Sequence, residues 1–244
     1  YEESNYLKKI QRTKLNKDVK WIKNLNEIKR GPVIFFGNEF FDAIPIKQFK
    51  RENGLLLEKY FFIDKNFRIY ERFKKANKRD TKNIENFKSL DNLKFIEYPK
   101  LGLEELRKIV KKVTILKGGI LLIDYGYLKP NNQNTLQSVF KHKKNNIFKN
   151  LGDADITSHV NFRLIEEFLI NNKLNVKNII TQKEFLERMG ILNRAEIISK
   201  KMKFSEQSDL YLRLKRLLNP NLMGKLFKVI LAFNHKTKDY FGFK

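Results

Sequence analysis

Short apolar runs that end in polar side chains mark the centre of this sequence. The first run, residues 33–36, lies between a Gly-Pro pair and a glycine, and Asn38, Glu39 and Asp42 follow it. An unbroken apolar run bounded by turn residues predicts a strand buried on both faces of a parallel sheet. Open α/β sheets place their ligands beyond the carboxyl ends of such strands. The polar residues after the run are therefore the leading candidate for a functional site.

A second run of the same kind occupies residues 120–123 and ends in Asp124, Tyr125 and Gly126. Before it, residues 101–117 carry apolar positions at helical spacing, and two glycines then end that pattern. This order, a helix followed by a buried strand with a polar end, is the βαβ alternation of a doubly wound sheet. The pattern therefore predicts an α/β fold, and residues 228–233 supply a last strand.

The rest of the pattern predicts the other elements. Helices are expected after a cap at Ser4, after a cap at Asn161, and over residues 183–189, 194–202 and 206–218; strands are expected over residues 18–22, 55–64, 67–73 and 176–182. Residues 51–92 contain the strand pair and a charged span, expected to be a surface loop with a helical portion. We interpret them as an insertion in a single domain that covers residues 1–244. Residues 129–150 are polar and basic, and their length predicts a functional loop or lid.

The cluster of Asn38, Glu39 and Asp42 has two chemical interpretations. Two carboxylates and an amide so close together would repel unless a cation joined them, and a carboxylate can hold a guanidinium through two parallel hydrogen bonds. Phe40, in the same turn, is then a lining residue. Alternatively, Asp42 or Asn38 caps a helix and Glu39 is a solvated acid. The residues alone leave these two interpretations about even.

Two further polar groups are candidates for the lining of the same site. Asp124 and Tyr125 end the neighbouring strand, so their polar atoms should face the same crevice; a simple turn is the competing explanation. Asp155 and His159 belong to a later polar cluster, in which helix capping or loop fastening is an equally physical role. Glu2 precedes a predicted helix, where an acid is also favoured by the helix dipole.

Composition narrows the classes of function. The chain has 51 Lys and Arg against 27 Asp and Glu, a formal charge of +24, which raises the prospect of an anionic partner. The joint excess of Lys, Asn, Ile and Phe also fits AT-rich coding. There is no cysteine, and the three histidines do not stand at metal-ligand spacing, so we expect no metal site. No apolar run is long enough to span a bilayer and no signal peptide opens the chain.

Six motifs follow one another along the chain: NEFFDAIPIKQF, GGILLIDYGY, NTLQSVFKHK, GDADITSHVNF, TQKEFLERMGI and MGKLFKVILAF. In this order, and nearly end to end, they resemble the MidA family of class I methyltransferases. That family includes a mitochondrial assembly factor of respiratory complex I that methylates arginine. The opening YEESNYLKKIQ looks like the family's V-E-x-S-P-x-L-x-x-x-Q segment, so we expect the chain to be incomplete at its amino terminus.

The resemblance implies a Rossmann-like mixed sheet that lacks its first strand and has an antiparallel last strand, with S-adenosyl-L-methionine as cofactor. It implies that Glu2 binds the ribose and that Asn38 also contacts the cofactor. It further implies that Asn38 and Glu39 hold the nucleophilic nitrogen, with Asp42 behind them. Two departures stand out. The family's glycine-rich first motif is absent from this chain, and Trp21 is not followed by the family's acidic residue. We therefore expect this chain alone to be inactive.

The leading hypothesis is methylation of a protein arginine on a respiratory complex I-type subunit, in a bacterial cytoplasm or a mitochondrial matrix. Methylation of nucleic acid is the first alternative. It is less favoured because Glu39 stands where amino-methyltransferases usually place a proline beside an aromatic residue that stacks on the base. The second alternative is a non-catalytic assembly or binding module.

Overall fold

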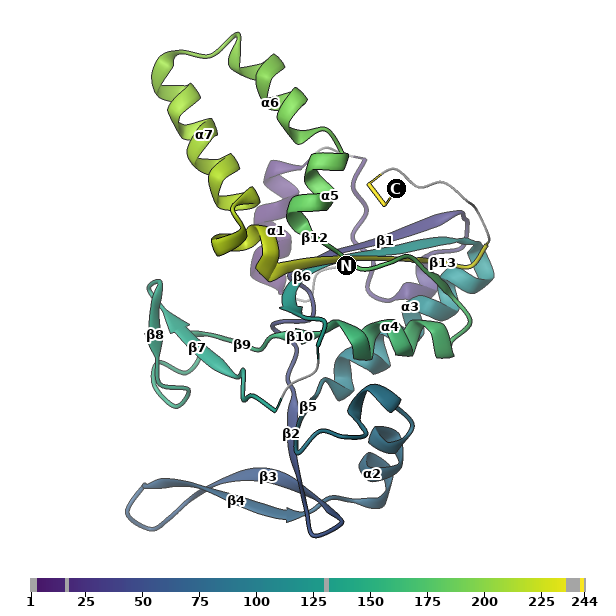
Figure 1. Ribbon diagram of the computed structural model, residues 1–244, viewed down its shortest axis with the longest axis vertical. Coiled ribbons are helices and arrows are strands. Elements are labelled where there is room, and N and C mark those ends of the chain that lie inside the picture. Colours follow the sequence, from purple (N-terminus) through teal and green to yellow (C-terminus); the bar gives the residue numbers. More distant parts are fainter. Residues whose placement is uncertain (1–3, 16–17, 130–131, 236–241, 244) are drawn as a thin grey trace.

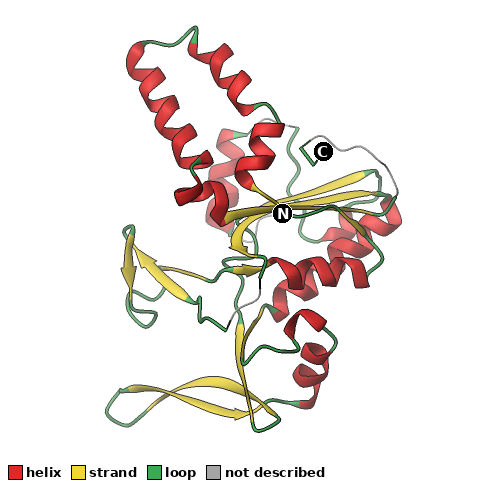
Figure 2. Cartoon of the chain, in the orientation of Figure 1, coloured by secondary structure: helices red, strands yellow, loops and turns green. Residues whose placement is uncertain are grey.

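The computed structural model describes residues 4–15, 18–129, 132–235 and 242–243 (Figures 1 and 2). Its helices are α1 (Asn5–Lys14), α2 (Lys78–Glu85), α3 (Lys100–Leu116), α4 (Phe162–Asn171), α5 (Gln182–Arg188), α6 (Ile191–Ser199) and α7 (Phe204–Leu218). Its strands are β1 (Val33–Asn38), β2 (Lys47–Glu52), β3 (Leu55–Ile63), β4 (Ile69–Lys75), β5 (Phe95–Tyr98), β6 (Gly118–Tyr127), β7 (Gln137–Phe140), β8 (Lys143–Asn145), β9 (Asp155–Thr157), β10 (Val160–Asn161), β11 (Asn175–Val176), β12 (Ile180–Thr181) and β13 (Phe227–Phe233).

The main sheet follows the order β1-β6-β13-β11, with β10 added to β6 and β12 to β13. β1 and β6 are parallel, whereas β13 runs antiparallel to β6. This confirms the expected mixed sheet with an antiparallel last strand. Because β1 and β6 run in the same direction, their carboxyl ends lie at the same edge, and the start of β13 lies beside them.

Two smaller sheets project from the main one (Figure 1). The first has the order β4-β3-β2-β5, and the second has the order β8-β7-β9. The expected strand pair is confirmed as the hairpin β3–β4, whose turn is held by Asp64: its carboxylate accepts hydrogen bonds from the backbone N–H of Asn66 and Arg68 at 2.8 and 2.9 Å. The treatment of residues 51–92 as an insertion in a single domain stays a prediction.

Helices cover the main sheet on both faces. On one face, α3 and α4 bury Leu106, Val110, Leu164 and Phe168 against the strands, and this is the larger core. On the other face, α5 packs Phe185 beside Val229 and its neighbours in a smaller cluster. These two apolar layers, with the sheet between them, are the arrangement expected of an α/β fold.

The predicted helix starts are confirmed by their caps. The hydroxyl of Ser4 accepts a hydrogen bond from the Leu7 N–H at 3.2 Å, and the side chain of Asn161 accepts one from the Leu164 N–H at 3.2 Å. Each cap satisfies a backbone donor that the first turn of a helix leaves unpaired. The charged span after β4 also contains the expected helical portion, α2, although Asp80 and Ile84 in it are buried rather than at the surface.

The strand predicted over residues 18–22 is wrong. Trp21 is held instead by the preceding helix: its ring N–H donates to the Gln11 side chain at 2.8 Å, and Arg12 lies 5.6 Å from the ring centroid. A strand needs a neighbour to pair with, and in the described part of the chain this segment has none.

The expectation that β1 is buried on both faces is also wrong. Val33 and Phe35 pack against the larger core, but Ile34 and Phe36 are 79% and 64% exposed. Among the described residues β1 pairs with β6 on one side only, so it is an edge strand. The apolar run therefore predicts the strand correctly but does not predict how deeply the strand is buried.

Three other segments differ in detail from the elements that the sequence predicts. β6 extends to Tyr127, so Asp124 lies within the strand rather than beyond its end. The polar segment 129–150, expected to be a loop or lid, supplies β7 and β8 to a small sheet. The strand predicted over residues 176–182 is divided into β11 and β12, which pair with opposite ends of β13.

Candidate active site

The turn that follows β1 is held in a tight, left-handed conformation. Asn38 lies beside Ile123 in the parallel ladder, and the next N–H, that of Glu39, donates to the Ile123 carbonyl at 2.9 Å. Glu39 has a φ of 50°, a backbone region that residues with a side chain seldom adopt. The Asn38 amide donates a hydrogen bond to the Glu39 carboxylate at 3.2 Å, so these polar groups are adjacent. Both residues are exposed. Strained residues of this kind gather at functional sites.

Asp124 fixes the chain beyond this turn. One of its carboxylate oxygens accepts hydrogen bonds from the backbone N–H of Phe41 at 2.8 Å and of Asp42 at 3.3 Å, and the other accepts one from Tyr125 at 2.9 Å. The side chain is 2% exposed. A buried carboxylate that accepts three backbone N–H groups ties β6 to the turn after β1 and so sets the direction in which that turn leaves the sheet.

Two buried carboxylates face each other at this edge. Burial raises the pKa of Asp124 to about 7, the charge of Asp42 raises it as well, and the three backbone N–H groups act in the opposite direction. Asp42 is 6% exposed, and its Oδ1 has no hydrogen-bond partner among the described residues. A buried carboxylate oxygen without a partner is unusual because desolvation of a charged group is strongly unfavourable. This edge of the sheet is therefore suited to a cation or a hydrogen-bond donor.

Tyr125 and His159 complete the buried side of this site. The Tyr125 ring lies 5.5 Å from the His159 ring, edge to face, and its hydroxyl interacts with both Thr157 and Asp42. Burial raises the pKa of Tyr125 and lowers that of His159; Glu97 acts against the shift of His159. The two rings thus form a neutral wall beside the carboxylates. The backbone of this segment is joined to the turn, because the Ser158 N–H donates to the Asp42 carbonyl at 2.9 Å.

Glu97, on β5, is a residue of this region that the sequence pattern did not single out. Its buried carboxylate accepts hydrogen bonds from the Gln48 side chain at 2.9 Å, from the Thr135 N–H at 3.0 Å and from the Thr135 hydroxyl. The same hydroxyl accepts a hydrogen bond from the backbone N–H of His159 at 2.9 Å. Glu97 therefore fastens the segment before β7 to the wall of the site. An acid between apolar residues of a short strand is the signal that could have found it.

Lys228, at the start of β13, was also missed. Its ammonium donates to the carbonyls of Gly126 and Leu226, each at 3.1 Å, and burial lowers its pKa. Lys228 lies opposite Asp124 in the antiparallel ladder and contributes to the lowered pKa of His159. A half-buried lysine at the start of the run KVILAF is visible in the sequence, but its partners are backbone groups that no pattern predicts.

The structure brings together most, but not all, of the residues predicted for the site. Asn38, Glu39, Phe40 and Asp42 lie in one turn, and the side chain of Phe40 is partly exposed, edge to face with Phe41. Asp155 is exposed on β9, paired with Val139 in the small sheet, and does not join the buried carboxylates. Glu2 lies outside the described residues.

The arrangement suits recognition of a cation by oxygen atoms. Glu39 offers an exposed carboxylate, Asn38 an amide beside it, and Asp42 a buried carboxylate oxygen without a partner in the described structure. No group of three or more His, Cys, Asp or Glu residues is placed to hold a metal ion in the part of the chain that is described. Within the same ranges, no helix is long and apolar enough to cross a membrane.

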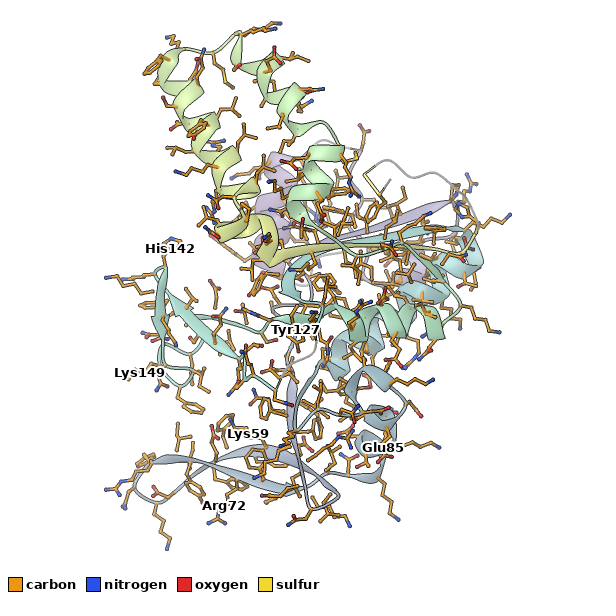
Figure 3. The ribbon with its side chains drawn as sticks, in the orientation of Figure 1. Lys59, Arg72, Glu85, Tyr127, His142 and Lys149 are labelled. Carbon is orange, nitrogen blue, oxygen red and sulfur yellow. The ribbon has the colours of Figure 1, made fainter. Side chains whose placement is uncertain are left out.

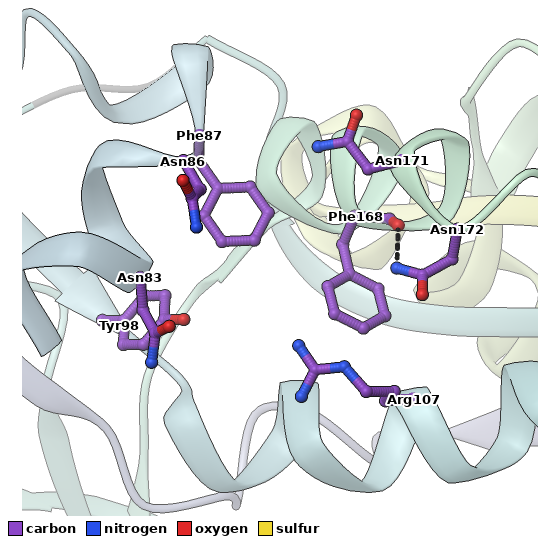
Figure 4. A pocket seen from close by; sticks show the side chains of 8 residues that line it. All are labelled: Asn83, Asn86, Phe87, Tyr98, Arg107, Phe168, Asn171 and Asn172. Atoms are coloured by element: carbon purple, nitrogen blue, oxygen red, sulfur yellow. Dashed lines mark hydrogen bonds between the residues drawn. The ribbon is translucent and has the colours of Figure 1, made fainter. Parts of the chain in front are cut away.

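A separate cavity of about 210 Å³ lies between α2, α3 and α4 (Figure 4). Arg107 points into it and lies 5.5 Å from the centroid of the Phe168 ring. Its walls also include four asparagines: Asn83, Asn86, Asn171 and Asn172. None of the residues predicted for the functional site lines this cavity, so it is not part of the strand-end site.

Solved structures define the class of fold. A Burkholderia thailandensis protein bound to S-adenosyl-homocysteine superposes with a TM-score of 0.77 at 22% identity, over 98% of this chain and 64% of that one. A second chain from the same bacterium gives a TM-score of 0.73 at 21% identity, over 91% of this chain and 60% of the other. The fold is that of a class I methyltransferase, as the mixed sheet and its two helical layers indicate.

The family model described as an S-adenosyl-L-methionine-dependent methyltransferase matches residues 1–180. The chain belongs to this family, the MidA family, whose methyl donor is S-adenosyl-L-methionine. It is 26% identical to the mitochondrial protein arginine methyltransferase NDUFAF7 homolog of Caenorhabditis elegans, over 94% of this chain and 54% of that protein. It is 24% identical to mitochondrial NDUFAF7 of Homo sapiens, over 95% of this chain and 52% of that protein. The chain thus spans about half the length of these relatives.

Proposed function

We propose that this chain carries the substrate side of an S-adenosyl-L-methionine-dependent protein-arginine N-methyltransferase. The observation that carries the proposal is the exposed carboxylate of Glu39, held beside the Asn38 amide in a strained turn at the end of β1. In class I methyltransferases this edge of the sheet is where ligands bind. The names of the relatives as protein arginine methyltransferases support the choice of substrate.

In this proposal the Glu39 carboxylate accepts two parallel hydrogen bonds from the substrate guanidinium, a planar, always charged group whose N–H donors suit that geometry. Asn38 orients the reacting nitrogen, and the buried Asp42 adds negative charge behind it. Asp124 is a positioning residue, because its hydrogen bonds to the backbone of Phe41 and Asp42 hold the turn in place. Methyl transfer mainly requires that the two partners be aligned, so such positioning is the main contribution that a protein makes.

The described residues at this site are suited to bind the methyl acceptor and to contact only part of the cofactor. Asn38, at the strand end, is proposed to border the methyl donor, and Glu2, which lies outside the described residues, is proposed to bind the ribose of that donor. When bound, the cofactor would supply an activated methyl group to the guanidinium nitrogen and leave as S-adenosyl-homocysteine, and the Glu39 carboxylate would accept the proton that this nitrogen loses. The proposed substrate is a protein that presents an arginine, such as a respiratory complex I-type subunit. The proposed location is a mitochondrial matrix or a bacterial cytoplasm.

The test is Glu39→Gln in the whole protein, with arginine methylation of candidate respiratory complex subunits measured by mass spectrometry. Glutamine keeps the size of the side chain and removes the charge, so we expect methylation to fall by about 100-fold or more, while S-adenosyl-homocysteine binding measured by calorimetry is unchanged. Glu196→Gln is the matched control, because Glu196 is exposed on α6 and its carboxylate forms an ion pair with Lys200 at 3.3 Å, away from the strand-end site.

Two outcomes would overturn the proposal. Normal methylation by the Glu39→Gln protein would remove Glu39 from the role described above. Cofactor binding without methylation of any arginine by the unaltered whole protein would instead favour a binding or assembly module built on the methyltransferase fold.

A further inference from the structure

The hairpin β3–β4 has two sides with different surroundings. The register pairs Tyr60 with Arg72 and Phe62 with Tyr70, so these four side chains share one side of the hairpin with Lys74. We name these five residues the aromatic–cationic side. The opposite side carries Phe61, whose ring meets that of Phe148, from the segment after β8, at 4.9 Å. Lys59, on that same opposite side, and Arg72 point away from each other in Figure 3.

Cations and rings alternate on the aromatic–cationic side. The Arg72 guanidinium lies 5.0 Å from the centroid of Tyr70 and 5.9 Å from that of Phe62. The Lys74 ammonium lies 4.6 Å from Phe62 and 5.8 Å from Tyr60. Phe62 and Tyr70 are stacked at 5.8 Å with an angle of 20° between their planes. Each cation is thus held over two rings rather than by an acid.

The accessible charge on this side is positive. The register places one acid of the two strands here, Glu58, which is 4% exposed and already accepts hydrogen bonds from Lys47 at 2.7 Å and from the Tyr60 hydroxyl at 2.8 Å. Neither Arg72 nor Lys74 forms an ion pair with any residue that the structure describes. Charged residues alone are common on edge strands, where they prevent aggregation. Exposed rings in register with them call for a further explanation.

We propose that the aromatic–cationic side binds single-stranded nucleic acid. Stacking of bases on aromatic side chains, with Arg and Lys on the phosphates, is the chemistry by which such strands are bound without strong sequence preference. Along β3 the ring centroids of Tyr60 and Phe62 are 6.4 Å apart, and the Tyr70 ring lies across the hairpin from Phe62 at 5.8 Å. The spacing along β3 is wider than the rise of about 3.4 Å per base in a duplex. The surface therefore suits an extended strand whose bases have separated.

This surface is distinct from the proposed methyl-transfer site. The hairpin belongs to the sheet β4-β3-β2-β5, whereas Asn38 and Glu39 end a strand of the main sheet. Binding at the hairpin involves no covalent step, so the methyl-transfer proposal and this one can fail independently. The formal charge of +24 on the chain assists the encounter with a polyanion.

The experiment measures binding of a fluorescent single-stranded uridine oligoribonucleotide by anisotropy, at several salt concentrations. We expect Tyr70→Ala to weaken binding about tenfold through the loss of one stacking platform. Arg72→Gln with Lys74→Gln should reduce the slope of log affinity against log salt by about 1.4, since each phosphate contact of a single strand contributes about 0.7. A duplex of the same length should bind more weakly than the single strand.

Matched controls come from α7. Tyr211→Ala removes an exposed tyrosine, and Arg213→Gln with Lys215→Gln removes an arginine and a lysine two residues apart, as in the hairpin. These variants should bind like the unaltered chain. The proposal is overturned if the hairpin and α7 variants weaken binding equally, or if no single strand binds. It is also overturned if polyglutamate binds with the same dependence on Tyr70, which would indicate an acidic protein partner.

Discussion

Replacement of Asp124 by asparagine should change how the stability of the protein depends on pH. The Asp124 side chain is 2% exposed and accepts hydrogen bonds from the backbone of Phe41, Asp42 and Tyr125. Burial, helped by the charge of Asp42, raises its pKa from 3.8 to about 7. The folded protein therefore holds a proton at this position that the unfolded chain releases at a much lower pH.

The sign and size of the effect follow from that difference. Because the pKa is higher in the folded state, the stabilising effect of the bound proton is complete below about pH 4 and is lost as the pH rises to about 7. At about 1.4 kcal/mol for each unit of pKa, the total is about 4 kcal/mol. About 2 kcal/mol of it falls between pH 5 and pH 7. The asparagine side chain does not titrate, so the variant lacks this dependence.

The assay is urea unfolding followed by circular dichroism at pH 5, 6, 7 and 8, on the unaltered chain and on Asp124→Asn. The difference between their free energies of unfolding cancels the titration of groups common to both proteins. We expect the unaltered chain to lose about 2 kcal/mol relative to the variant between pH 5 and pH 7, and little more above that.

Asp42→Asn provides the internal control. It removes the charge that is the smaller of the two causes raising the Asp124 pKa, and it leaves burial, the larger cause, in place. The pH dependence should therefore be shallower in Asp42→Asn but still present. A free-energy difference between the unaltered chain and Asp124→Asn that stays constant from pH 5 to pH 8 would refute this reasoning.

Two further substitutions test how the rest of the site is built. Glu97→Ala should lower the free energy of unfolding by about 2 kcal/mol, measured by urea unfolding, because it removes one acceptor of the buried Gln48 amide and the acceptor of the half-buried Thr135 N–H. Glu97→Gln, which keeps one acceptor, should lower it less, and equal losses would contradict the assignment. Gly126→Ala should lower the thermal midpoint by several degrees, because a Cβ atom there would lie 2.0 Å from the Val160 carbonyl oxygen and force β10 away from β6. An unchanged midpoint would show that this backbone contact is not rigid.

Elements encoded by local pattern were predictable, and elements that depend on a neighbour were less so. The caps at Ser4 and Asn161 and the hairpin turn at Asp64 use hydrogen bonds that span only a few residues, so the sequence indicates them directly. The strand expected around Trp21 required a partner strand that the described structure does not supply. The depth of burial of β1 likewise depends on neighbours that are remote in sequence.

The site shows the same division. The cluster of Asn38, Glu39 and Asp42 is contiguous in sequence and could be recognised as a functional turn. The contact of Asp42 with Asp124 joins residues 82 positions apart, and only the parallel pairing of β1 with β6 creates it. Glu97 is 38 positions from Thr135, so its role in fastening the wall of the site could not be inferred from spacing.

At the left-handed turn, the stability of the fold and the proposed activity favour different amino acids at the position of Glu39. A residue with a Cβ atom at a φ of 50° destabilises the fold by about 1 to 2 kcal/mol relative to glycine. Variants selected for thermal stability alone should therefore accumulate glycine or asparagine at this position. Variants selected for the proposed transfer to arginine should retain the acid, so the amino acid found at this turn reports which of the two properties a population has been selected for.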